Sequence, residues 1–477
     1  MGRKVVIEPV TRIEGHAKVV LHLDDQGNLE TARFHVNEFR GFEKFCEGRL
    51  FYEMPQITER ICGICPVSHH LASVKACDRI IGVTPPRPAQ LLRELMHMGQ
   101  IIQSHSMHFF ELAGPDLLLG FDCNPATRNV VGLYQANAPL TVKAIKMRKF
   151  GQEIISRLGE RRVHPNFAVP GGVNTTLDLK SRDAMLAQID EMIAGCNEAI
   201  AIFKGWMEKN GQDMRKFASF ATSYLGLVDD NDALNLYDGA ARLVDKDLGL
   251  LERFDPRMYL DYISEHVESW SYLKFPYYKK LGWPNGVYRV GPLGRLNAST
   301  HIATPLAQKE FELYRQICGG KVVEGTLYYH YARLIEDLYA VERARELLLD
   351  KDILSTDIQL SGKVTNHEGV GVIEAPRGTL WHHYWVDDNG VLEKVNLIVA
   401  TGNNNYAMSR AVEEVARAYV DPRNITEGAL NRVEAAIRAY DPCLSCSTHA
   451  VGKMPMEMIV LDSQGNEINR AERSSRE

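Results

Sequence analysis

Two short motifs near opposite ends of the sequence constrain how the chain can fold. They are Arg60-Ile-Cys62-Gly-Ile-Cys65-Pro-Val-Ser-His69 and Asp441-Pro-Cys443-Leu-Ser-Cys446-Ser-Thr-His449, and most of the 477-residue chain lies between them. Each places two cysteines three positions apart and a histidine shortly after. Four thiols and two imidazoles that converge on one point provide what a soft-metal site requires. We therefore expect a fold that brings the two motifs together.

The spacing leaves three kinds of metal site open. Two Cys-x-x-Cys pairs are typical of structural zinc, although zinc knuckles usually keep the pairs about 15–20 residues apart. Four thiolates also bind an iron–sulfur cluster readily. A catalytic transition-metal centre is the third possibility. The cysteines alone do not separate these alternatives.

Composition removes several classes of protein. Apolar residues make up 45% of the chain, so a large core forms without metal or disulfide staples. Nine cysteines without an export signal do not indicate a disulfide framework. The net charge is −6 and no basic block stands out, which argues against a nucleic-acid partner. No apolar run is long enough to span a bilayer, and the predicted localisation is cytoplasmic.

Helical periodicity dominates the middle and the end of the sequence. We expect an α+β fold, predominantly α, in which a core bundle of long helices carries peripheral β-hairpins. The first 36 residues and the segments 219–254 and 369–401 read as β-structure, with a hairpin through Asp387-Asp-Asn-Gly390. The expected helices are 66–76, 86–112, 140–158, 182–209, 305–317, 326–349, 405–419 and 426–440. His105 and His108, on an apolar helix face, read as core histidines.

Polar residues near the motifs favour a catalytic site over structural zinc. In Glu374-Ala-Pro376-Arg377-Gly378, a lone arginine stands between proline and glycine in a hairpin. A structural zinc site has no use for it, whereas a guanidinium over an open metal position can polarise a substrate or hold anionic ligands. Acid–base groups and hard ligands are available from Glu14, His16, Glu43, Asp116 and His449.

Taken together, these motifs resemble the large subunit of nickel–iron hydrogenases, over essentially the whole chain. The resemblance rests on the two cysteine motifs with Arg12-Ile-Glu-Gly-His16, Arg40-Gly-Phe-Glu43 and Glu374-Ala-Pro-Arg-Gly378. Three further stretches are similar to the cytoplasmic NAD-reducing, bidirectional branch: Phe45-Cys-Glu-Gly-Arg49, Trp270-Ser-Tyr-Leu-Lys-Phe-Pro-Tyr-Tyr278 and Ala400-Thr-Gly-Asn-Asn-Asn405.

This resemblance implies a dinuclear metal centre and its reaction. It makes Cys62, Cys65, Cys443 and Cys446 nickel ligands, with Cys65 and Cys446 also bridging to an iron that carries CO and cyanide. The implied reaction is the reversible heterolytic cleavage of H2 into a proton and a hydride. The proton acceptor would be Cys443, Cys446 or Arg377 acting with a thiolate, and Glu14 would relay the proton outward.

Further residues take supporting roles by the same likeness. His69 would hydrogen-bond near a bridging sulfur, and Asp116, Pro376 and Asp441 would surround the centre. Glu43 and His449 would bind magnesium. The chain would be cut after His449 or Ala450, which makes 1–449 a single catalytic domain and 450–477 a propeptide. The charged stretch Asn466–Glu477 reads as solvated or disordered.

The implied partners carry the remaining cofactors. They are a small subunit with an iron–sulfur cluster, diaphorase subunits with FMN and NAD(H), and a maturation endopeptidase with nickel-insertion proteins. The chain has no GxGxxG motif, which agrees with NAD being bound elsewhere. Two alternatives stay open: a different acceptor, such as a deazaflavin or a ferredoxin-type carrier, and a non-catalytic relative, such as a hydrogen sensor or a complex-I-like subunit.

Overall fold

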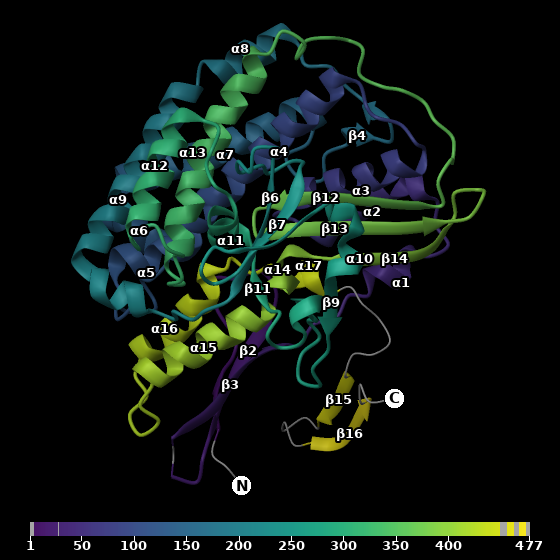
Figure 1. The fold of residues 1–477 in the computed structure, drawn as a ribbon. Helices are drawn as coiled ribbons and strands as arrows, with labels where there is room; N and C mark the ends of the chain where they lie inside the picture. The colour runs from purple at the N-terminus through teal and green to yellow at the C-terminus, as the bar shows by residue number, and fades with distance from the viewer. Residues whose placement is uncertain (1–3, 27, 449–455, 462–466, 474–477) are drawn as a thin grey trace.

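The computed structural model describes the backbone of residues 4–26, 28–448, 456–461 and 467–473. Side chains are described for the first two of these segments, apart from 212–214. The structure combines a group of long helices with several small sheets (Figure 1). The predicted α+β fold with a core of long helices is confirmed.

Four long helices form the bundle on one side of the molecule (Figure 1). They are α4 (Arg87–Met107), α7 (Ala138–Gly159), α9 (Ile189–Lys216) and α13 (Tyr328–Leu349). α13 is buried around nearly its whole circumference and contacts α4 and α9, which places it inside the bundle. α4 and α7 approach closely because a glycine sits at their crossing. A Cβ on Gly151 would lie 2.5 Å from the carbonyl oxygen of Gly99.

A three-stranded antiparallel sheet carries the helix that follows the first cysteine motif. Its strands are β12 (Glu368–Ala375), β13 (Gly378–Val386) and β14 (Leu392–Ile398), in that order. Helix α3 (Pro66–Ile80) packs on β12 and β13 (Figure 1). The helix backbone rests almost directly on β12, since a Cβ on Gly371 would lie 1.9 Å from the carbonyl oxygen of Ala72. This contact fixes the height of α3 above the sheet.

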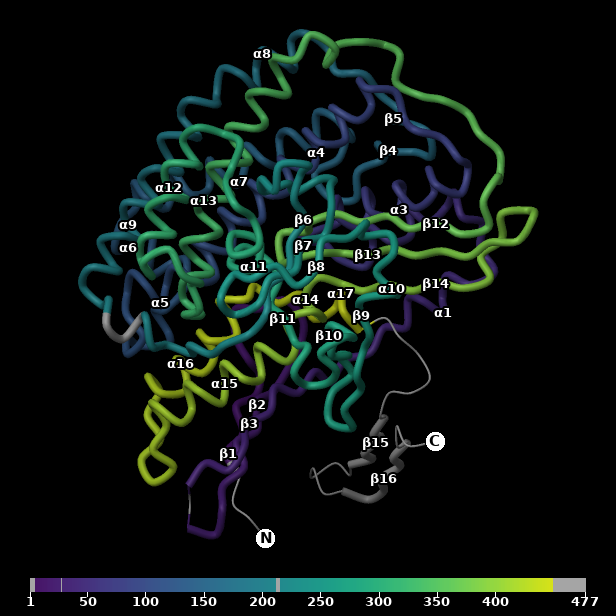
Figure 2. Tube along the Cα trace, viewed as in Figure 1, coloured from purple at the N-terminus to yellow at the C-terminus, as the bar shows by residue number. Residues whose placement is uncertain are grey.

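The two ends of the chain meet on another face of the molecule. The antiparallel sheet β1 (Lys4–Ile7), β2 (Ala17–Leu23) and β3 (Leu29–Val36) packs through β3 on α15 (Asn405–Tyr419), which in turn packs on α16 (Glu427–Ala439). The traces in Figures 1 and 2 show this N-terminal sheet beside the two C-terminal helices. The loop between β1 and β2 is thereby held against the segment that follows α16.

The remaining elements are short and complete the layers around this frame. A mixed sheet has the order β11-β6-β7-β8, and two-stranded sheets pair β10 with β9, β4 with β5 and β15 with β16. Their bounds are β4 (Ala168–Val169), β5 (Gly172–Val173), β6 (Ser223–Val228), β7 (Ala240–Val244), β8 (Leu250–Phe254), β9 (Ile263–His266), β10 (Phe275–Tyr278), β11 (Tyr288–Arg289), β15 (Met456–Leu461) and β16 (Glu467–Arg473). The other helices are α1 (Phe42–Cys46), α2 (Met54–Thr58), α5 (Gly114–Leu119), α6 (Val130–Ala136), α8 (Leu179–Leu186), α10 (Tyr259–Tyr262), α11 (Gly291–Ala298), α12 (Pro305–Gln316), α14 (Ala400–Asn403) and α17 (Leu444–Ser447).

Three local expectations need correction. The single helix predicted over 182–209 is two helices, because α8 ends at Leu186 and α9 begins at Ile189. The helix predicted to reach residue 112 is α-helical to Met107 and then continues as one π-helical turn over His108–Ala113. The tail stretch expected to be disordered contains β16, whose backbone pairs antiparallel with β15 and so satisfies its hydrogen-bonding groups. Among the described residues, no helix is both long and apolar enough to cross a membrane.

Candidate metal centre

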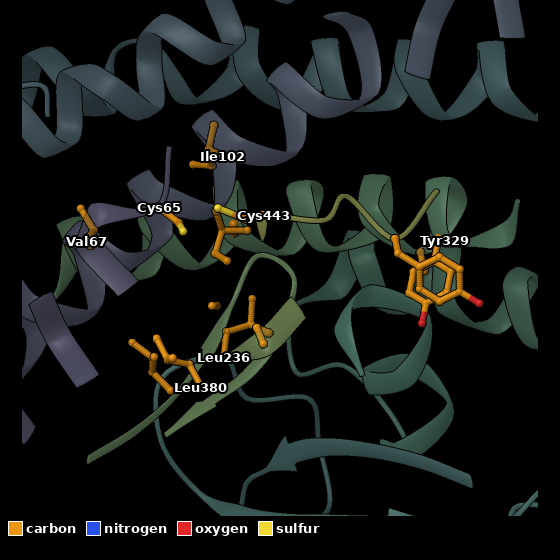
Figure 3. Close-up of a cluster of buried hydrophobic side chains, with 14 of the residues drawn as sticks. Cys65, Val67, Ile102, Leu236, Tyr329, Leu380 and Cys443 are labelled. Atoms are coloured by element: carbon orange, nitrogen blue, oxygen red, sulfur yellow. The ribbon is translucent and has the colours of Figure 1, made fainter. Parts of the chain in front are cut away.

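The four motif cysteines meet in the interior. Their sulfur atoms all lie within 4.8 Å of one another, and all four side chains are buried. The sulfurs of Cys62 and Cys443 are 3.3 Å apart, those of Cys65 and Cys446 3.6 Å, and those of Cys443 and Cys446 2.7 Å. All four are free thiols. Figure 3 shows Cys65 and Cys443 pointing toward each other between Ile102 and Leu380. All four sulfurs are thus close enough to bind one metal ion at about 2.3 Å, a typical metal–sulfur distance.

The start of α3 positions the first pair. Cys65 caps the helix and Pro66 occupies its first turn, as the sequence predicts. The sulfur of Cys62 accepts hydrogen bonds from the backbone N–H groups of Ile64 and Cys65, both at 3.2 Å. The loop is also tied to α4, because the side-chain amides of Gln100 and Gln103 donate to the carbonyl oxygen of Ile64 at 2.9 Å. The backbone donors stabilise a thiolate on Cys62.

The N-terminal loop positions the second pair. Glu14 forms a parallel bridge with Cys443: its N–H donates to the carbonyl oxygen of Pro442 at 3.4 Å, and its carbonyl oxygen accepts from the N–H of Leu444 at 3.1 Å. The N–H of Cys443 donates to the Thr401 hydroxyl at 3.0 Å. The sequence marked the stretch Ala400–Asn405 only by its likeness to a family branch. In the structure it supports the cysteine loop directly.

Glu14 is also the carboxylate that hydrogen-bonds to the sulfur cluster. The thiol of Cys443 donates to its Oε2 at 3.0 Å, and the N–H of Ser445 donates to the same oxygen at 3.1 Å. Glu14 is half-buried, whereas Cys443 is fully buried. The carboxylate therefore connects a buried sulfur with a more exposed part of the chain. His16 faces away, with its ring nitrogen 2.7 Å from Glu38 and most of its side chain exposed.

Arg377 and Asp441 form a buried ion pair beside the sulfurs. Nε of Arg377 donates to the carbonyl oxygen of Asp441 at 2.5 Å, and Nη2 donates to its Oδ1 at 3.0 Å. Nη1 of Arg377 and Oδ2 of Asp441 are buried without a hydrogen-bond partner among the described residues. Asp441 adopts a φ of 54°, a left-handed conformation that is rare outside glycine. The pair thus leaves one donor of the guanidinium available beside the cysteines.

A second buried arginine, which the sequence motifs did not reveal, holds the turn that carries Arg377. Arg295 is fully buried on α11 and pairs with Glu336 at 2.6 Å and Glu374 at 2.8 Å. It also donates to the carbonyl oxygens of Ala375, at 2.7 Å, and of Pro376, at 3.3 Å. No local pattern marks this residue, since its partners come from α13 and β12. Pro376 is buried in the turn.

The electrostatics of the centre favour a bound cation. Burial raises the pKa values of the Cys443 and Cys446 thiols well above their usual range. The neighbouring sulfurs raise the pKa of Cys443 further, whereas for Cys446 the contacts with Cys62 and Cys65 raise the pKa and the contact with Cys443 lowers it. Burial alone would raise the pKa of the Cys62 thiol as well. Hydrogen bonds with the other three cysteines and the charge of Arg377 outweigh burial and hold this pKa well below its usual value. A cation removes the penalty for burying several thiolates together. The four sulfur atoms fit a metal ion bound by thiolates. The unpaired guanidinium N–H of Arg377 beside them fits anionic ligands on that metal.

Two other predicted residues, His69 and Asp116, form buried contacts with side chains other than the cysteines. His69, one turn after Cys65 on α3, is buried and its Nδ1 lies 3.1 Å from Nε2 of His382. Asp116 contacts Arg12 at 2.5 Å and Arg438 at 2.8 Å rather than Arg377, so it bears on the centre through the loop that carries Glu14.

For the expected magnesium site only one side chain is described. Oε1 of Glu43 accepts from the N–H of Leu397 at 2.8 Å. The chain reaches this neighbourhood at Thr448, whose carbonyl oxygen accepts from the N–H groups of Arg40 and Gly41. His449 and Ala450, expected as ligand and cleavage position, lie outside the described residues.

The helix histidines behave as core residues. His105 pairs with Glu336 at 3.0 Å, and His108 shares a hydrogen bond of 2.7 Å with the carbonyl oxygen of Arg438. Both are fully buried, and burial lowers the pKa of His105 to about 4. Both rings are therefore neutral structural groups, as the sequence predicts.

A substitution at Gly15 tests the contact between the two ends of the chain. Its φ is +83°, and a Cβ there would lie 2.8 Å from Cβ of Leu444. Gly15→Ala is expected to displace Glu14 and the cysteine loop and so to lower the affinity of the four cysteines for a metal ion by about 10–100-fold. Gly48→Ala is the matched control, because its φ is +81° but nothing lies within 4 Å of the added carbon. Equal effects of the two substitutions on the metal content of the purified chain would show that the contact is unimportant.

Comparisons with known proteins agree with this site. Residues 40–122 and 229–449 match the family described as nickel-dependent hydrogenase, and residues 4–39 match one described as HoxL-like. The chain is 44% identical to the beta subunit of the NAD-reducing hydrogenase HoxS of Cupriavidus necator, over 99% of this chain and all of that subunit. It is 42% identical to one subunit of the F420-non-reducing hydrogenase of Methanothermobacter thermautotrophicus, over 98% of this chain and 99% of that subunit.

Solved structures give the same answer. A chain of an NAD+-reducing [NiFe]-hydrogenase in the H2-reduced state superposes with a TM-score of 0.91 at 45% identity, over 94% of this chain and 99% of that chain. The Ni-Fe-Se hydrogenase of Desulfovibrio vulgaris Hildenborough in the reduced state gives a TM-score of 0.77 at 25% identity, over 94% of this chain and all of that one. The expected resemblance is confirmed, and with it the enzyme class: the chain belongs to the nickel-dependent hydrogenase family.

Proposed function

We propose that this chain is the catalytic subunit that splits H2 at a nickel–iron centre and passes the electrons, through an iron–sulfur partner subunit, to NAD+ in the cytoplasm. The convergence of four buried cysteines beside Glu14 and Arg377 is the observation that carries the proposal. In it, Cys62, Cys65, Cys443 and Cys446 hold nickel, and Cys65 and Cys446 also hold an iron with CO and cyanide ligands. Glu43 and His449 hold a magnesium ion.

The bound metal pair supplies the redox chemistry that splits dihydrogen into two protons and two electrons. The chain's own groups bind and move the first proton. The thiol of Cys443 lies 3.0 Å from Oε2 of Glu14, within the range for direct proton transfer. Glu14, half-buried, then carries the proton away from the dry sulfur cluster. Cys446, 2.7 Å from Cys443, is the second sulfur that can share it.

Arg377 contributes by charge rather than by proton transfer. Burial lowers the pKa of the guanidinium, but Asp441 and the thiolates of Cys443, Cys65 and Cys62 outweigh it and raise the pKa well above its usual value. It therefore stays protonated. Its unpaired Nη1 donor fits the anionic ligands of an iron atom, and Asp441 fixes its orientation.

Glu14→Gln separates proton transfer from assembly. The amide keeps the size of the side chain but cannot accept the thiol proton, so H2/D2 exchange is expected to fall roughly 10²–10⁴-fold while nickel and iron contents stay unchanged. Glu38→Gln, in the neighbouring segment and 40% exposed, is the control and should exchange at the wild-type rate. Wild-type exchange in Glu14→Gln would remove Glu14 from the proton route.

The C-terminal segment is proposed as a propeptide that is removed once nickel is bound. Cys446→Ser replaces a soft ligand by a hard one and is expected to abolish both nickel binding and removal of residues 450–477. Metal analysis and intact mass of the purified chain measure the two effects. Cys196→Ser, which alters a buried thiol on α9, should retain both. A Cys446→Ser chain that lost its tail and turned over hydrogen would overturn the assignment.

An exposed aromatic and basic surface supports the iron–sulfur partner, and one pocket on it is lined by residues from Arg40 to Arg60, just before Cys62 in the chain. Phe45 is 55% and Tyr52 54% exposed, and Arg49 stacks on Phe45 at 4.5 Å. Gly63, between the first two cysteines, is also exposed, so this part of the surface approaches the centre. Aromatic residues and arginine are the side chains enriched at protein interfaces. We assign this surface to the iron–sulfur subunit.

Phe45→Glu tests the partner and the acceptor together. The wild-type complex is expected to reduce NAD+ with H2. The substitution should lower this rate about tenfold or more and weaken co-purification of the partner, while H2/D2 exchange, which needs no electron acceptor, stays unchanged. Leu349→Glu, at a residue 64% exposed on α13, is the control. Reduction of a deazaflavin or a ferredoxin-type carrier in place of NAD+ by the wild-type complex would favour the alternative acceptor.

A further inference from the structure

Arg438, in the last turn of α16, is a buried arginine whose five donor N–H groups are all used. Nε donates to the carbonyl oxygen of Thr11 at 2.9 Å. Nη2 donates to the Thr11 hydroxyl at 3.0 Å and to Oε2 of Glu434 at 2.6 Å. Nη1 donates to Oδ2 of Asp116 at 2.8 Å and to Oδ1 of Asn431 at 2.9 Å. The guanidinium therefore fastens Thr11 of the N-terminal loop to α16.

Further contacts hold the same loop beside Arg438. Glu434 accepts from the N–H of Thr11 at 2.6 Å and from its hydroxyl at 3.2 Å. Nη2 of Arg12 donates to Oδ1 of Asp116 at 2.5 Å. The backbone of Arg12 has a φ of 56°, a left-handed conformation that a non-glycine residue keeps only where its surroundings hold it. Arg438, Glu434 and Asp116, which we call the loop clamp, provide those surroundings.

The clamped residues lead directly to Glu14. Three residues after Thr11, the N–H of Glu14 donates to the carbonyl oxygen of Pro442 at 3.4 Å, and its carbonyl oxygen accepts from the N–H of Leu444 at 3.1 Å. Its Oε2 lies 3.0 Å from the sulfur of Cys443. The loop is thus tied at two points to one continuous stretch of chain, from α16 to the second cysteine pair. Without the loop clamp, the contacts of Glu14 would have to hold a strained loop alone.

We propose that Arg438 is a positioning residue for proton transfer between Cys443 and Glu14. It acts through Thr11, because it seats the loop so that the carboxylate stays within hydrogen-bond reach of the thiol. A misplacement of about 1 Å can cost about 10²-fold in rate. Lysine cannot replace it, since the three donors of an ammonium group cannot serve the same five acceptor atoms. The inference rests on the proposed proton route and adds the residue that sets its geometry.

Arg438→Lys keeps the charge of the loop clamp but not its geometry. In the assembled complex, the exchange of H2 with D2O per nickel atom is expected to fall about 10–100-fold, while KM for H2 stays unchanged. In a Glu14→Gln background the same substitution should cause no further loss, because the two residues act on one step. A purely structural role would lower nickel content and leave the rate per nickel atom at the wild-type value.

Thr11→Val is a milder variant that keeps the test decisive where Arg438→Lys lowers nickel content. It removes the hydroxyl that accepts from Arg438 and retains the backbone carbonyl contact. A smaller loss of exchange per nickel atom is expected, and it too should vanish in the Glu14→Gln background.

Arg343→Lys is the matched control. Arg343 also joins two helices through a carboxylate, because it donates from α13 to Glu94 of α4 at 2.7 and 3.1 Å. Its substitution should leave exchange per nickel atom at the wild-type rate.

Two outcomes would overturn the role of Arg438. One is an equal fold-loss from Arg438→Lys with and without Glu14→Gln. The other is a wild-type rate per nickel atom in both Arg438→Lys and Thr11→Val. Wild-type exchange in Glu14→Gln alone would instead refute the proposed proton route itself. A loss in Glu14→Gln together with independent losses from Arg438→Lys would refute only the positioning role.

Discussion

The contact between the N-terminal loop and the C-terminal cysteine loop is the interaction on which the site depends. Glu14 pairs with Cys443 through the backbone and through its carboxylate, and Gly15 leaves no room for a side chain against Leu444. This contact joins two segments that lie near opposite ends of the chain. The helices and sheets between the two motifs keep the four sulfur atoms within 4.8 Å of one another. Both cysteine pairs are needed there, since a site of four thiolates cannot be made by one pair alone.

Buried charge is the second constraint, and it explains why so much of the chain surrounds the site. Arg377 with Asp441, and Arg295 with Glu336 and Glu374, are ion pairs shielded from solvent. Burying such groups costs several kcal/mol per ion, which only good geometry and further hydrogen bonds offset. Removing one partner would leave an uncompensated charge. The rigid frame of α11, α13 and β12 is thus a condition for presenting one guanidinium donor beside the sulfurs.

The chemistry of the site is divided among separate elements. In the proposed mechanism, the loop before β2 provides the carboxylate that accepts the proton, the start of α3 and the segment after α16 provide the thiolates, and the turn before β13 provides the positive charge. The surface around Phe45, next to the first cysteine loop, is where we place the electron-transfer partner. In the proposed mechanism, protons and electrons leave through different parts of the chain, which suits a reaction that must separate the two.

The sequence by itself determined the candidate ligand set, the family and the long helices. Cysteine spacing, Pro66 at a helix start and strict apolar periodicity are local signals, so the start of α3 and the bounds of α7, α12 and α15 follow closely from them. It did not reveal the roles of Arg295 and Thr401 or the contact between His69 and His382, because each depends on partners far away in the chain. It also did not reveal that Asp116 pairs with Arg12 and Arg438. Such pairings depend on three-dimensional packing, which decides which buried charges and hydrogen-bonding groups can reach one another.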